Sequence, residues 1–370
     1  MFRRVSLGTA VIAALALATP QAVAGTRPNA VQQGLDNLVA DHDFPAAMAS
    51  VREPDGRDRF YSAGVGDVAT GRPVPKDGQI RIASSTKMFT SAVVLQLVGE
   101  DRIGLDEPIE TYLPGLVRGA GIDGHDITVR QVLQHTSGLP EYFTLDYKDI
   151  QHRYVEPREL LDRALAQPAS FPPGSSWRYS NTNYVVAGLI VQRVTGRPVG
   201  EEITNRVVRP LGLRHTYWPG TGDQTIREKH ALGYYTPTSQ AAERVEFTEL
   251  DPSWAWAAGQ MIATPGDVNE FLAALLGGEV LKPAQLAEMK KTVEAPGFPP
   301  DWRYGLGLMR ISLSCGGVAW GHGGDIDGYE NRNGITEGGR AATVAVTALP
   351  TPEQGPDMLP DRVLDTALCQ

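Results

Sequence analysis

Patterns typical of β-strands stand near both ends of this 370-residue chain, and a long stretch rich in helices and loops separates them. The predicted strands are residues 46–52, 59–64, 303–311, 317–322 and 342–349, and the predicted helices include residues 30–41, 88–98, 184–194 and 267–276. Because strands are stable only when they pair within a sheet, the two ends of the chain are expected to meet. We therefore predict one discontinuous α/β lobe wrapped around a helical insertion.

The first 24 residues have the pattern of a signal peptide. Two arginines precede an apolar run at residues 11–18, and the sequence Ala-Val-Ala ends the segment at residue 24. The run is too short to span a bilayer, which disfavours the alternative of a retained membrane anchor. We expect a secreted, extracellular protein that begins near Gly25 and has no membrane span.

The charge balance of the chain argues against polyanionic partners. The 34 lysines and arginines, less two in the leader, face 43 acidic residues, so the net charge without the leader is about −11. An acidic protein without a basic patch is not expected to bind nucleic acid or anionic membranes. The seven histidines are scattered without metal-ligand spacing, so neither a metal nor a cofactor is expected. We expect a monomer.

The chain contains two cysteines, Cys315 and Cys369. In an exported protein, two cysteines most simply form a disulfide with each other, although two separate thiols remain an alternative. The bond would close a loop over 54 positions and contribute about 4 kcal/mol in the chain-entropy model. It would also tie the C-terminal segment to the sheet.

The predicted apolar helix at residues 88–98 begins with hydroxyl and ammonium groups. Ser84 and Lys87 lie three residues apart, so they share one face of a helix. Burial and the helix N-terminus both lower the pKa of a lysine, so Lys87 can accept a proton from Ser84. The backbone N–H of Ser84 can help to hold an oxyanion. The alternative is a capping serine beside a lysine that reaches water.

Two further stretches carry groups suited to hydrolysis. Tyr179 and Asn181 stand in a loop before the predicted helix at residues 184–194, where a phenol can relay a proton and an amide can orient a substrate. A His-Gly-Gly sequence at residues 322–324 follows an apolar strand, and its glycines permit close approach. Both are also compatible with ordinary turns, and a second Tyr-x-Asn occurs at residues 329–331.

Taken in order, Ser-x-x-Lys, Tyr-x-Asn and His-x-Gly resemble the serine β-lactamase and penicillin-binding protein family. The segments LQHTSGLP and PGSSWRYSNTNYVVAGLIVQRVTG resemble its branch of class C β-lactamases, soluble D-alanyl-D-alanine carboxypeptidases, D-aminopeptidases and esterases. The resemblance implies an α/β (α+β) two-lobe fold, with an antiparallel sheet flanked by helices, an all-helical lobe, and the site between them. Its sheet lobe would span residues 25–90 and 290–370, and its helical lobe residues 91–289.

The resemblance also implies roles for particular residues. Ser84 would be the acylated nucleophile, Lys87 and Tyr179 would transfer its proton, and Asn181 would contact the substrate amide. The remaining roles fall on the second half of the chain. The cleft strand would contain His322, Gly323 and Gly324, the oxyanion hole would use the backbone N–H groups of Ser84 and Asp325, and the cysteine pair resembles that of the soluble carboxypeptidases.

The strand after His322 departs from the family pattern. Typical β-lactamases have Lys-Thr-Gly where this chain has His-Gly-Gly, and the carboxypeptidases have hydroxyl groups where this chain has Gly323 and Asp325. Hydroxyl donors there would bind a substrate carboxylate, so we expect relaxed selectivity for a free C-terminus and a gain if a hydroxyl is restored at residue 323. Arg310 or Arg332 could supply the missing donor.

These observations predict a secreted serine hydrolase that forms an acyl-enzyme on Ser84. The expected activity is that of a D-alanyl-D-alanine carboxypeptidase, with small peptide or peptidoglycan-like substrates and β-lactam inhibitors. The alternatives within the family are a D-aminopeptidase or D-amino acid amidase, a short-chain esterase, and a non-catalytic penicillin-binding sensor. A Ser-His-Asp hydrolase with His322 as its base is a separate alternative, although the chain lacks Gly-x-Ser-x-Gly.

Overall fold

The computed structural model describes residues 1–2, 29–143, 150–235, 244–350 and 359–370. The predicted leader and its cleavage point near Gly25 therefore fall almost wholly outside the described residues. Within the described ranges, no helix is long and apolar enough to cross a membrane.

The largest sheet joins strands from both ends of the chain. Its order is β10-β11-β12-β13-β15-β16-β1-β2-β3, and β14 pairs with β15 beside this path. The strands are β1 Ala46–Arg52, β2 Asp58–Asp67, β3 Arg72–Pro73, β10 Val293–Glu294, β11 Arg303–Tyr304, β12 Met309–Ser312, β13 Val318–Gly321, β14 Gly324–Ile326, β15 Tyr329–Thr336 and β16 Ala341–Val346. Strand β1 pairs antiparallel with β16, and Ala47 faces Val346. This pairing joins the strands from the beginning of the chain to those from its end. The predicted discontinuous sheet is confirmed.

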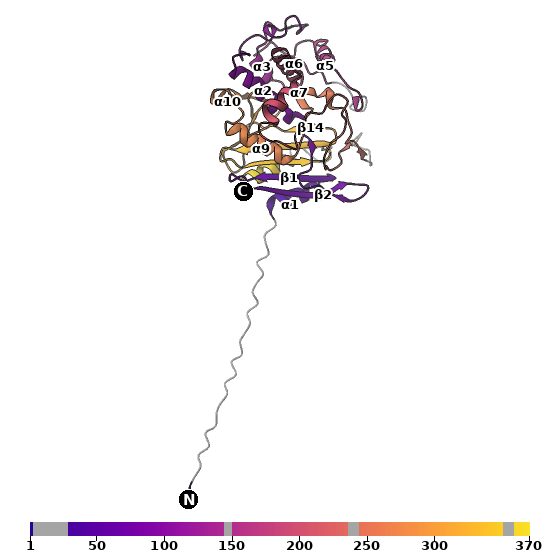
Figure 1. The fold of residues 1–370 in the computed structure, drawn as a ribbon, viewed down its shortest axis with the longest axis vertical. Helices are drawn as coiled ribbons and strands as arrows, with labels where there is room; N and C mark the ends of the chain where they lie inside the picture. The colour runs from indigo at the N-terminus through magenta and orange to yellow at the C-terminus, as the bar shows by residue number, and fades with distance from the viewer. Residues whose placement is uncertain (3–28, 144–149, 236–243, 351–358) are drawn as a thin grey trace.

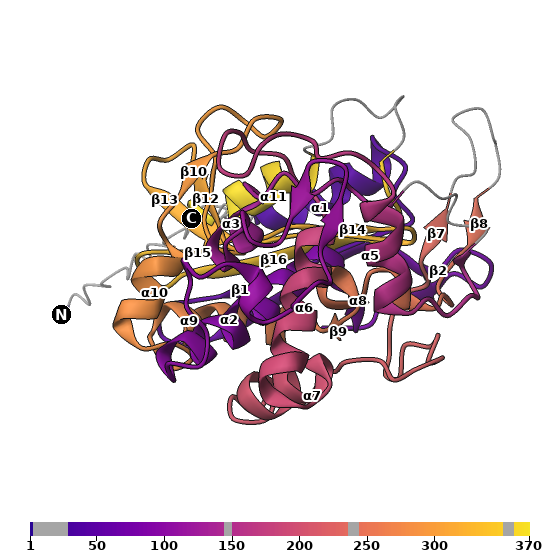
Figure 2. The same ribbon diagram turned by 90° about the horizontal axis from the view of Figure 1, so that it is seen from above.

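Both faces of the central strands are covered (Figures 1 and 2). Helices α1 (Ala30–Ala40) and α11 (Leu359–Leu368) pack on one face, and α9 (Pro265–Leu276) packs on the other. Alternate side chains of a strand point to opposite faces, so Ala47 packs among the residues of α1 and α11, and Met48 joins the core on the other side. Burial on both faces explains why β1 and β16 are mostly apolar along their length rather than alternating, with Ser50 and Thr343 as buried polar exceptions.

Helix α9 differs from the predicted division into lobes. The sequence places its residues in the helical lobe, whereas the structure packs the helix against β1, β15 and β16. The reason is its apolar face, on which Phe271 is fully buried and also stacks on Phe89 of helix α2 (Thr86–Gly99) at 3.8 Å between ring centroids. The helix therefore joins the sheet to the helical lobe.

The predicted single strand at residues 303–311 is in fact a tight hairpin. Strands β11 and β12 pair antiparallel with each other across residues 305–308. Gly307 adopts φ 76°, a left-handed conformation that reverses the chain and that glycine tolerates best. The sequence pattern alone missed this reversal because apolar residues continue through it.

The helical lobe is built around α2, which is apolar on nearly every side and contacts α6 and α8. Among the described residues, the helices of this part are α2, α3 Val129–Gln134, α5 Pro157–Leu165, α6 Thr182–Thr195, α7 Val199–Ile203, α8 Trp256–Gly259 and α10 Pro283–Met289, with short 3-10 helices η1 Ala83–Ser85, η2 Ile109–Thr111 and η4 Pro252–Trp254 and the π-helix η3 Thr204–Val208. Small strand pairs join β4 Ile80–Arg81 to β9 Ile262–Ala263, β5 Arg118–Gly119 to β6 Ile122–Asp123, and β7 Tyr234–Tyr235 to β8 Val245–Glu246. Thr128 caps α3 through a capping box with Gln131.

The two cysteines form the predicted disulfide. Cys315, in the turn between β12 and β13, bonds to Cys369, which follows the last helix. Their Cα atoms are 5.8 Å apart, a normal separation for a disulfide. The bond therefore ties the end of α11 to the turn between β12 and β13.

Candidate active site

Ser84 lies in the short turn η1 at the head of helix α2, between the sheet and the helical lobe. The residue before it, Ala83, adopts φ 44°, a conformation that costs energy for a residue with a Cβ atom. Pairing of the preceding strand β4 with β9 holds this segment in place, and the backbone N–H of Ile82 donates to Met261 at 3.1 Å. The surrounding sheet and helix thus impose the turn that presents Ser84 to the cleft.

Lys87 is completely buried one turn further along and points back to Ser84. Its Nζ lies 2.9 Å from Ser84 Oγ, 2.8 Å from Asn181 Oδ1 and 2.8 Å from the carbonyl oxygen of Ala258. The predicted proximity of serine and lysine is confirmed. The alternative in which the lysine reaches water is wrong, since its whole side chain is enclosed.

The protonation state of Lys87 follows from this enclosure. Burial lowers its pKa from 10.5 to about 7, against the opposing negative charges of Glu141 and Asp325. A neutral amine can donate to Asn181 and Ala258 and still keep a lone pair directed at the hydroxyl of Ser84. The arrangement is therefore suited to removing the proton of Ser84 near neutral pH.

Tyr179 and Asn181 complete the helical side of the site. The Tyr179 ring centroid lies 4.9 Å from Lys87 Nζ, and burial raises the pKa of Tyr179 well above 10, opposed by a hydrogen bond with Ser84. Tyr179 is therefore a neutral phenol that can pass a proton to or from Ser84. The Nδ2 of Asn181 donates to Glu141 Oε2 at 3.1 Å, which directs its oxygen toward Lys87.

Glu141 is a residue that the sequence analysis missed. Its Oε2 also accepts the backbone N–H of Asn181 at 2.7 Å, and burial raises its pKa. It follows directly after the LQHTSGLP segment, and a carboxyl group beside that motif was the available signal. Its negative charge is one of the groups that favour the protonated form of Lys87.

Glu141→Gln is therefore expected to move the acid limb of the kcat/KM profile to lower pH. Removing the negative charge disfavours the ammonium form of Lys87, so the pKa of Lys87 falls below about 7 and the neutral base persists in more acidic solution. The measurement is a pH–rate profile between about pH 5 and 9. Glu201→Gln, at a side chain that is 41% exposed, serves as a control for net charge. A shift to higher pH would contradict the electrostatic argument.

Strand β14 contributes the opposite wall of the site. A Cβ atom on Gly324 would lie only 2.2 Å from the carbonyl oxygen of Ile82 and 2.9 Å from the backbone nitrogen of Ser84, so only glycine permits this approach. The predicted close contact at the glycine pair is confirmed. It places β14 against the segment that carries the Ser84 N–H, and the N–H of Asp325 remains the predicted second donor of an oxyanion hole.

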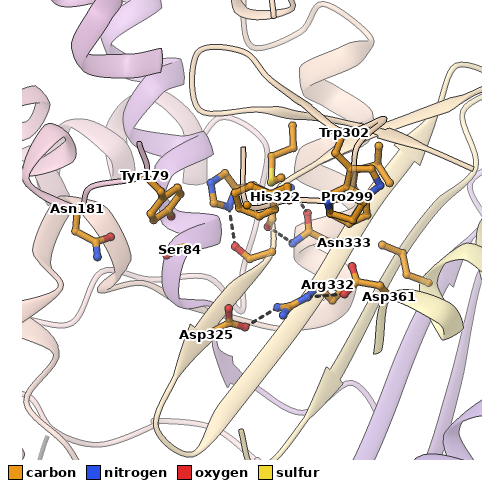
Figure 3. A pocket seen from close by; sticks show the side chains of 16 residues that line it. Ser84, Tyr179, Asn181, Pro299, Trp302, His322, Asp325, Arg332, Asn333 and Asp361 are labelled. Atoms are coloured by element: carbon orange, nitrogen blue, oxygen red, sulfur yellow. Dashed lines mark hydrogen bonds and ion pairs between the residues drawn. The ribbon is translucent and has the colours of Figure 1, made fainter. Parts of the chain in front are cut away.

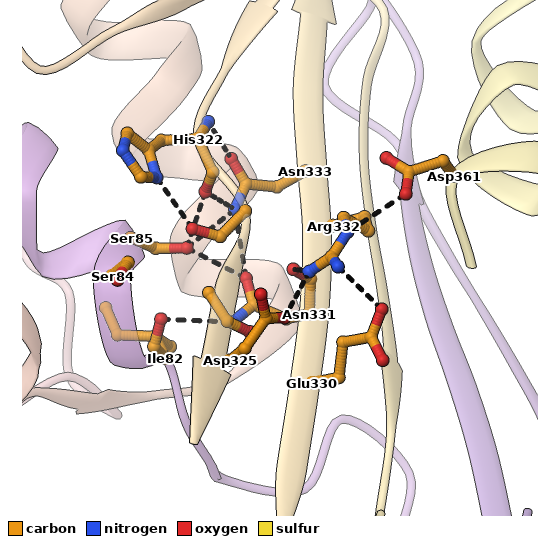
Figure 4. Close-up of polar contacts among 12 residues, drawn as sticks. Ile82, Ser84, Ser85, His322, Asp325, Glu330, Asn331, Arg332, Asn333 and Asp361 are labelled. Atoms are coloured by element: carbon orange, nitrogen blue, oxygen red, sulfur yellow. Dashed lines mark hydrogen bonds and ion pairs between the residues drawn. The ribbon is translucent and has the colours of Figure 1, made fainter. Parts of the chain in front are cut away.

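A buried polar network that the sequence analysis missed fixes this contact (Figure 4). Ser85 Oγ lies 2.6 Å from the carbonyl oxygen of His322, which also accepts from Asn333 Nδ2 at 2.8 Å. Asn331 Nδ2 donates to the carbonyl oxygen of Ile82 at 3.0 Å. The second Tyr-x-Asn, at residues 329–331, thus belongs to strand β15, where Asn331 has a structural role.

His322 makes its contacts away from the nucleophile. Its Nε2 lies 2.9 Å from the hydroxyl of Tyr304, and its Nδ1 lies 2.6 Å from the carbonyl oxygen of Gly323. Burial lowers its pKa to about 3, so the ring is neutral at physiological pH. With both nitrogens engaged elsewhere, His322 is not placed to act as the base of a Ser-His-Asp triad.

A cavity of about 400 Å³ opens beside Ser84 on the sheet side (Figure 3). One wall is apolar and the floor is charged. The lining residues are Ser84, Tyr179, Asn181, Gly297, Phe298, Pro299, Trp302, Met309, Ile311, His322, Gly323, Asp325, Arg332, Asn333, Asp361 and Leu364. The structure therefore gathers the predicted nucleophile, phenol, amide and strand residues around one space, while Lys87 lies behind it. Arg310 is not among the lining residues.

Arg332 does reach the cavity, but acidic side chains surround its guanidinium group. It lies 2.5 Å from Asp325 Oδ1, 2.8 Å from Glu330 Oε1 and 3.0 Å from Asp361 Oδ2. One positive charge thus faces three carboxylates, so the cluster has an excess of negative charge. An arginine paired in this way has no free charge to offer a substrate carboxylate.

The position of Arg332 also changes the expectation for residue 323. A Cβ atom on Gly323 would lie 3.1 Å from both Cδ and Nη1 of Arg332. The glycine therefore leaves room for the arginine, and a threonine there would push the guanidinium aside. The gain expected from restoring a hydroxyl at this position does not follow from the structure.

Comparisons with known proteins agree with this geometry. A sequence model of the family described as Beta-lactamase matches residues 31–368. The chain is 27% identical over 302 residues to penicillin-binding protein 4 of Amycolatopsis lactamdurans, covering 79% of this chain and 74% of that protein. Two other curated relatives are matched over 41% and 49% of their own length.

Two solved structures are similar over most of the chain. One is a D-stereospecific amidohydrolase from a Streptomyces species, with a TM-score of 0.81 and 38% identity, covering 88% of this chain and 96% of that one. The other is the D-amino acid amidase from Ochrobactrum anthropi SV3, with a TM-score of 0.81 and 29% identity, covering 92% of this chain and 97% of that one. Both similarities extend over the sheet, the helical lobe and the cleft between them.

Proposed function

The chain belongs to the Beta-lactamase family of serine hydrolases, and from this membership we propose that it hydrolyses amides of D-amino acids through an acyl-enzyme on Ser84. The observation that carries the choice of amides is the pairing of Arg332 with three carboxylates at the cavity floor. The names of the two similar solved structures support the D configuration and the amide bond. A carboxypeptidase, the activity expected from the sequence, becomes the second candidate.

The proposed reaction uses groups that already touch one another. Neutral Lys87 accepts the hydroxyl proton of Ser84 while Oγ attacks the carbonyl carbon of the substrate. The carbonyl oxygen becomes an oxyanion held by the N–H groups of Ser84 and Asp325. When the C–N bond breaks, the leaving nitrogen takes the proton from Lys87 by way of Tyr179. Water then cleaves the acyl ester, with the same groups removing its proton and returning one to Ser84.

The charges beyond the scissile bond favour a neutral leaving group. A carboxypeptidase must bind a free carboxylate there, and a charged hydrogen bond to it would contribute about 1.5–3 kcal/mol. His322 is neutral and the charge of Arg332 is already compensated, while Asp325 adds a repulsive charge. An amide avoids this repulsion. An ester avoids it equally well, so esterase activity is expected as a side reaction.

The proposed function predicts a ranking of substrates. D-phenylalanine amide should be cleaved with a higher kcat/KM than its L-enantiomer, D-alanyl-D-alanine peptides or a chromogenic cephalosporin, all assayed at the same pH. The sharpest comparison is a D-alanyl-D-alanine peptide against its own C-terminal amide, since the two differ only in the charge at the leaving group. A strong preference for the free acid would contradict the proposal and support a carboxypeptidase.

A variant of the cavity floor completes this experiment. Asp361→Asn keeps an acceptor for Arg332 Nε but removes one negative charge. The ratio of kcat/KM for the free acid to kcat/KM for the amide should therefore rise about fivefold, corresponding to about 1 kcal/mol. Asp365→Asn, one helical turn further along α11 and bonded to Ser314, removes the same charge outside the cavity and should leave the ratio unchanged. Equal ratios in both variants would show that the Arg332 cluster does not set selectivity.

We also propose that the enzyme acts outside the cytoplasm and binds β-lactams at Ser84. The leader pattern supports export, and the bond between Cys315 and Cys369 is of a kind that persists in oxidising compartments. The intact set of Ser84, Lys87, Tyr179 and Asn181, linked by contacts with Lys87, supports an active enzyme over a non-catalytic sensor.

A further inference from the structure

Three buried side chains form a hydrogen-bonded chain between the helical lobe and the sheet. His135, at the end of helix α3, has its Nε2 3.1 Å from the hydroxyl of Tyr304 in strand β11. The same hydroxyl lies 2.9 Å from Nε2 of His322. All three residues are at most 3% exposed, so water does not compete for these bonds. The chain thus runs from the helical lobe to the sheet.

The protons at the helical end are assigned by the partners of His135. Its Nδ1 lies 3.2 Å from the backbone nitrogen of Ser180 and 3.2 Å from Nδ2 of Asn183, and both of these groups donate. Nδ1 must therefore be an acceptor, and a neutral ring then has its hydrogen on Nε2. Burial holds the pKa of His135 well below 6.5, which agrees with a neutral ring. His135 accordingly donates to Tyr304.

The protons at the sheet end are assigned in the same way. Nδ1 of His322 lies 2.6 Å from the carbonyl oxygen of Gly323, which can only accept, so the hydrogen of His322 is on Nδ1. Its Nε2 must then accept, and the hydroxyl of Tyr304 is the donor. Every bond points the same way, from the Ser180 N–H to the Gly323 carbonyl, and the two histidines are opposite tautomers.

We propose that Tyr304 is a positioning residue for catalysis, which links the two walls of the cleft through this one-directional chain. Ser180 stands between Tyr179 and Asn181, so bonding at its N–H fixes the loop that carries the proton-transfer groups. Gly323 directly precedes the glycine that packs against the turn of Ser84. The hydrogen-bonded chain therefore sets the distance between Tyr179 and the strand that lines the cavity.

Ring contacts along the chain strengthen this link. The ring of His135 lies 4.3 Å from that of Tyr179 between centroids, and the ring of Tyr304 lies 6.3 Å from it. A shift of His135 would consequently tilt Tyr179 relative to Ser84. The hydroxyl oxygen of Tyr304 is the single atom on which both halves of the chain depend.

Tyr304→Phe removes that hydroxyl and keeps the ring. Because the chain holds proton-transfer groups rather than binding substrate, kcat for D-phenylalanine amide should fall at least about tenfold while KM changes less than about threefold. The matched control is Tyr329→Phe in strand β15 of the same sheet. It removes an equally buried hydroxyl, which donates to the carbonyl oxygen of Ala231. The control should lose a similar amount of thermal stability and keep kcat within about threefold. Equal kcat losses in the two variants would overturn the proposal.

A second measurement does not depend on turnover. Nitrogen-15 NMR of the imidazole rings in the wild-type protein, with assignment through His135→Gln and His322→Gln, should find His135 protonated on Nε2 and His322 protonated on Nδ1. The kinetic arm rests on the proposed substrate class, whereas this arm does not, so failure of one is distinguishable from failure of the other. Identical tautomers of the two rings, or a positively charged His322 at neutral pH, would contradict the proposed direction of the hydrogen bonds.

Discussion

Ser84→Ala is expected to abolish both amide hydrolysis and covalent labelling by a β-lactam, while the protein remains folded. Loss of the nucleophile in a serine hydrolase lowers kcat by roughly four to six orders of magnitude. The side chain contributes little to packing, since its Oγ faces the cavity and its polar neighbours there are Lys87 and Tyr179. The melting temperature should therefore stay within a few degrees of that of the wild type.

Two other serines serve as internal controls for this result. Ser85 and Ser180 flank the site but are buried and bonded to the carbonyl oxygens of His322 and Pro140. Intact-mass measurement should detect one penicilloyl adduct on the wild type and none on Ser84→Ala, and peptide mapping should place the adduct on Ser84. Labelling that persists on either of the other serines would contradict the assignment of the nucleophile.

The parts of the fold that sequence could predict are those determined by local patterns. The strands at both ends, the buried helix α2 and the cap at Thr128 each follow from the spacing of apolar residues or from a capping side chain. Ser84 and Lys87 could be paired for the same reason, because three positions along a helical turn fix their proximity. These predictions needed no knowledge of distant contacts.

The remaining features depend on contacts between segments far apart in the chain. No local sequence pattern predicts that Arg332 pairs with Asp361 or that Tyr304 joins His135 to His322. Tertiary packing alone brings these groups together. The hairpin around Gly307 was hidden for a related reason, because a reversal that remains buried keeps its apolar residues. Selectivity of the site therefore had to be inferred from the structure, where the charge partners of each group become visible.

Lys87→Met is expected to lower kcat by at least about three orders of magnitude, whereas His322→Gln should have a much smaller effect. Methionine matches the buried volume of lysine but offers no lone pair to Ser84. His322 lies beside the site with its nitrogens bonded to Tyr304 and Gly323, so its loss disturbs alignment without removing the base. The comparison separates a Ser-Lys mechanism from a Ser-His mechanism by measurement of kcat on one substrate. A severe loss in His322→Gln with a mild loss in Lys87→Met would support the opposite assignment.

The pH dependence provides an independent test of the same role. A base works only when neutral, and the pKa of Lys87 is about 7, so kcat/KM of the wild type should rise through pH 7 and fall about tenfold for each unit below it. Lys87→Arg keeps a positive charge that cannot be lost in this range, so it should be as inactive as Lys87→Met at every pH. Residual activity in both variants should show no inflection near pH 7. If that inflection survived in Lys87→Met, it would have to belong to another group, and burial of Lys87 beside Ser84 would then serve structure rather than catalysis.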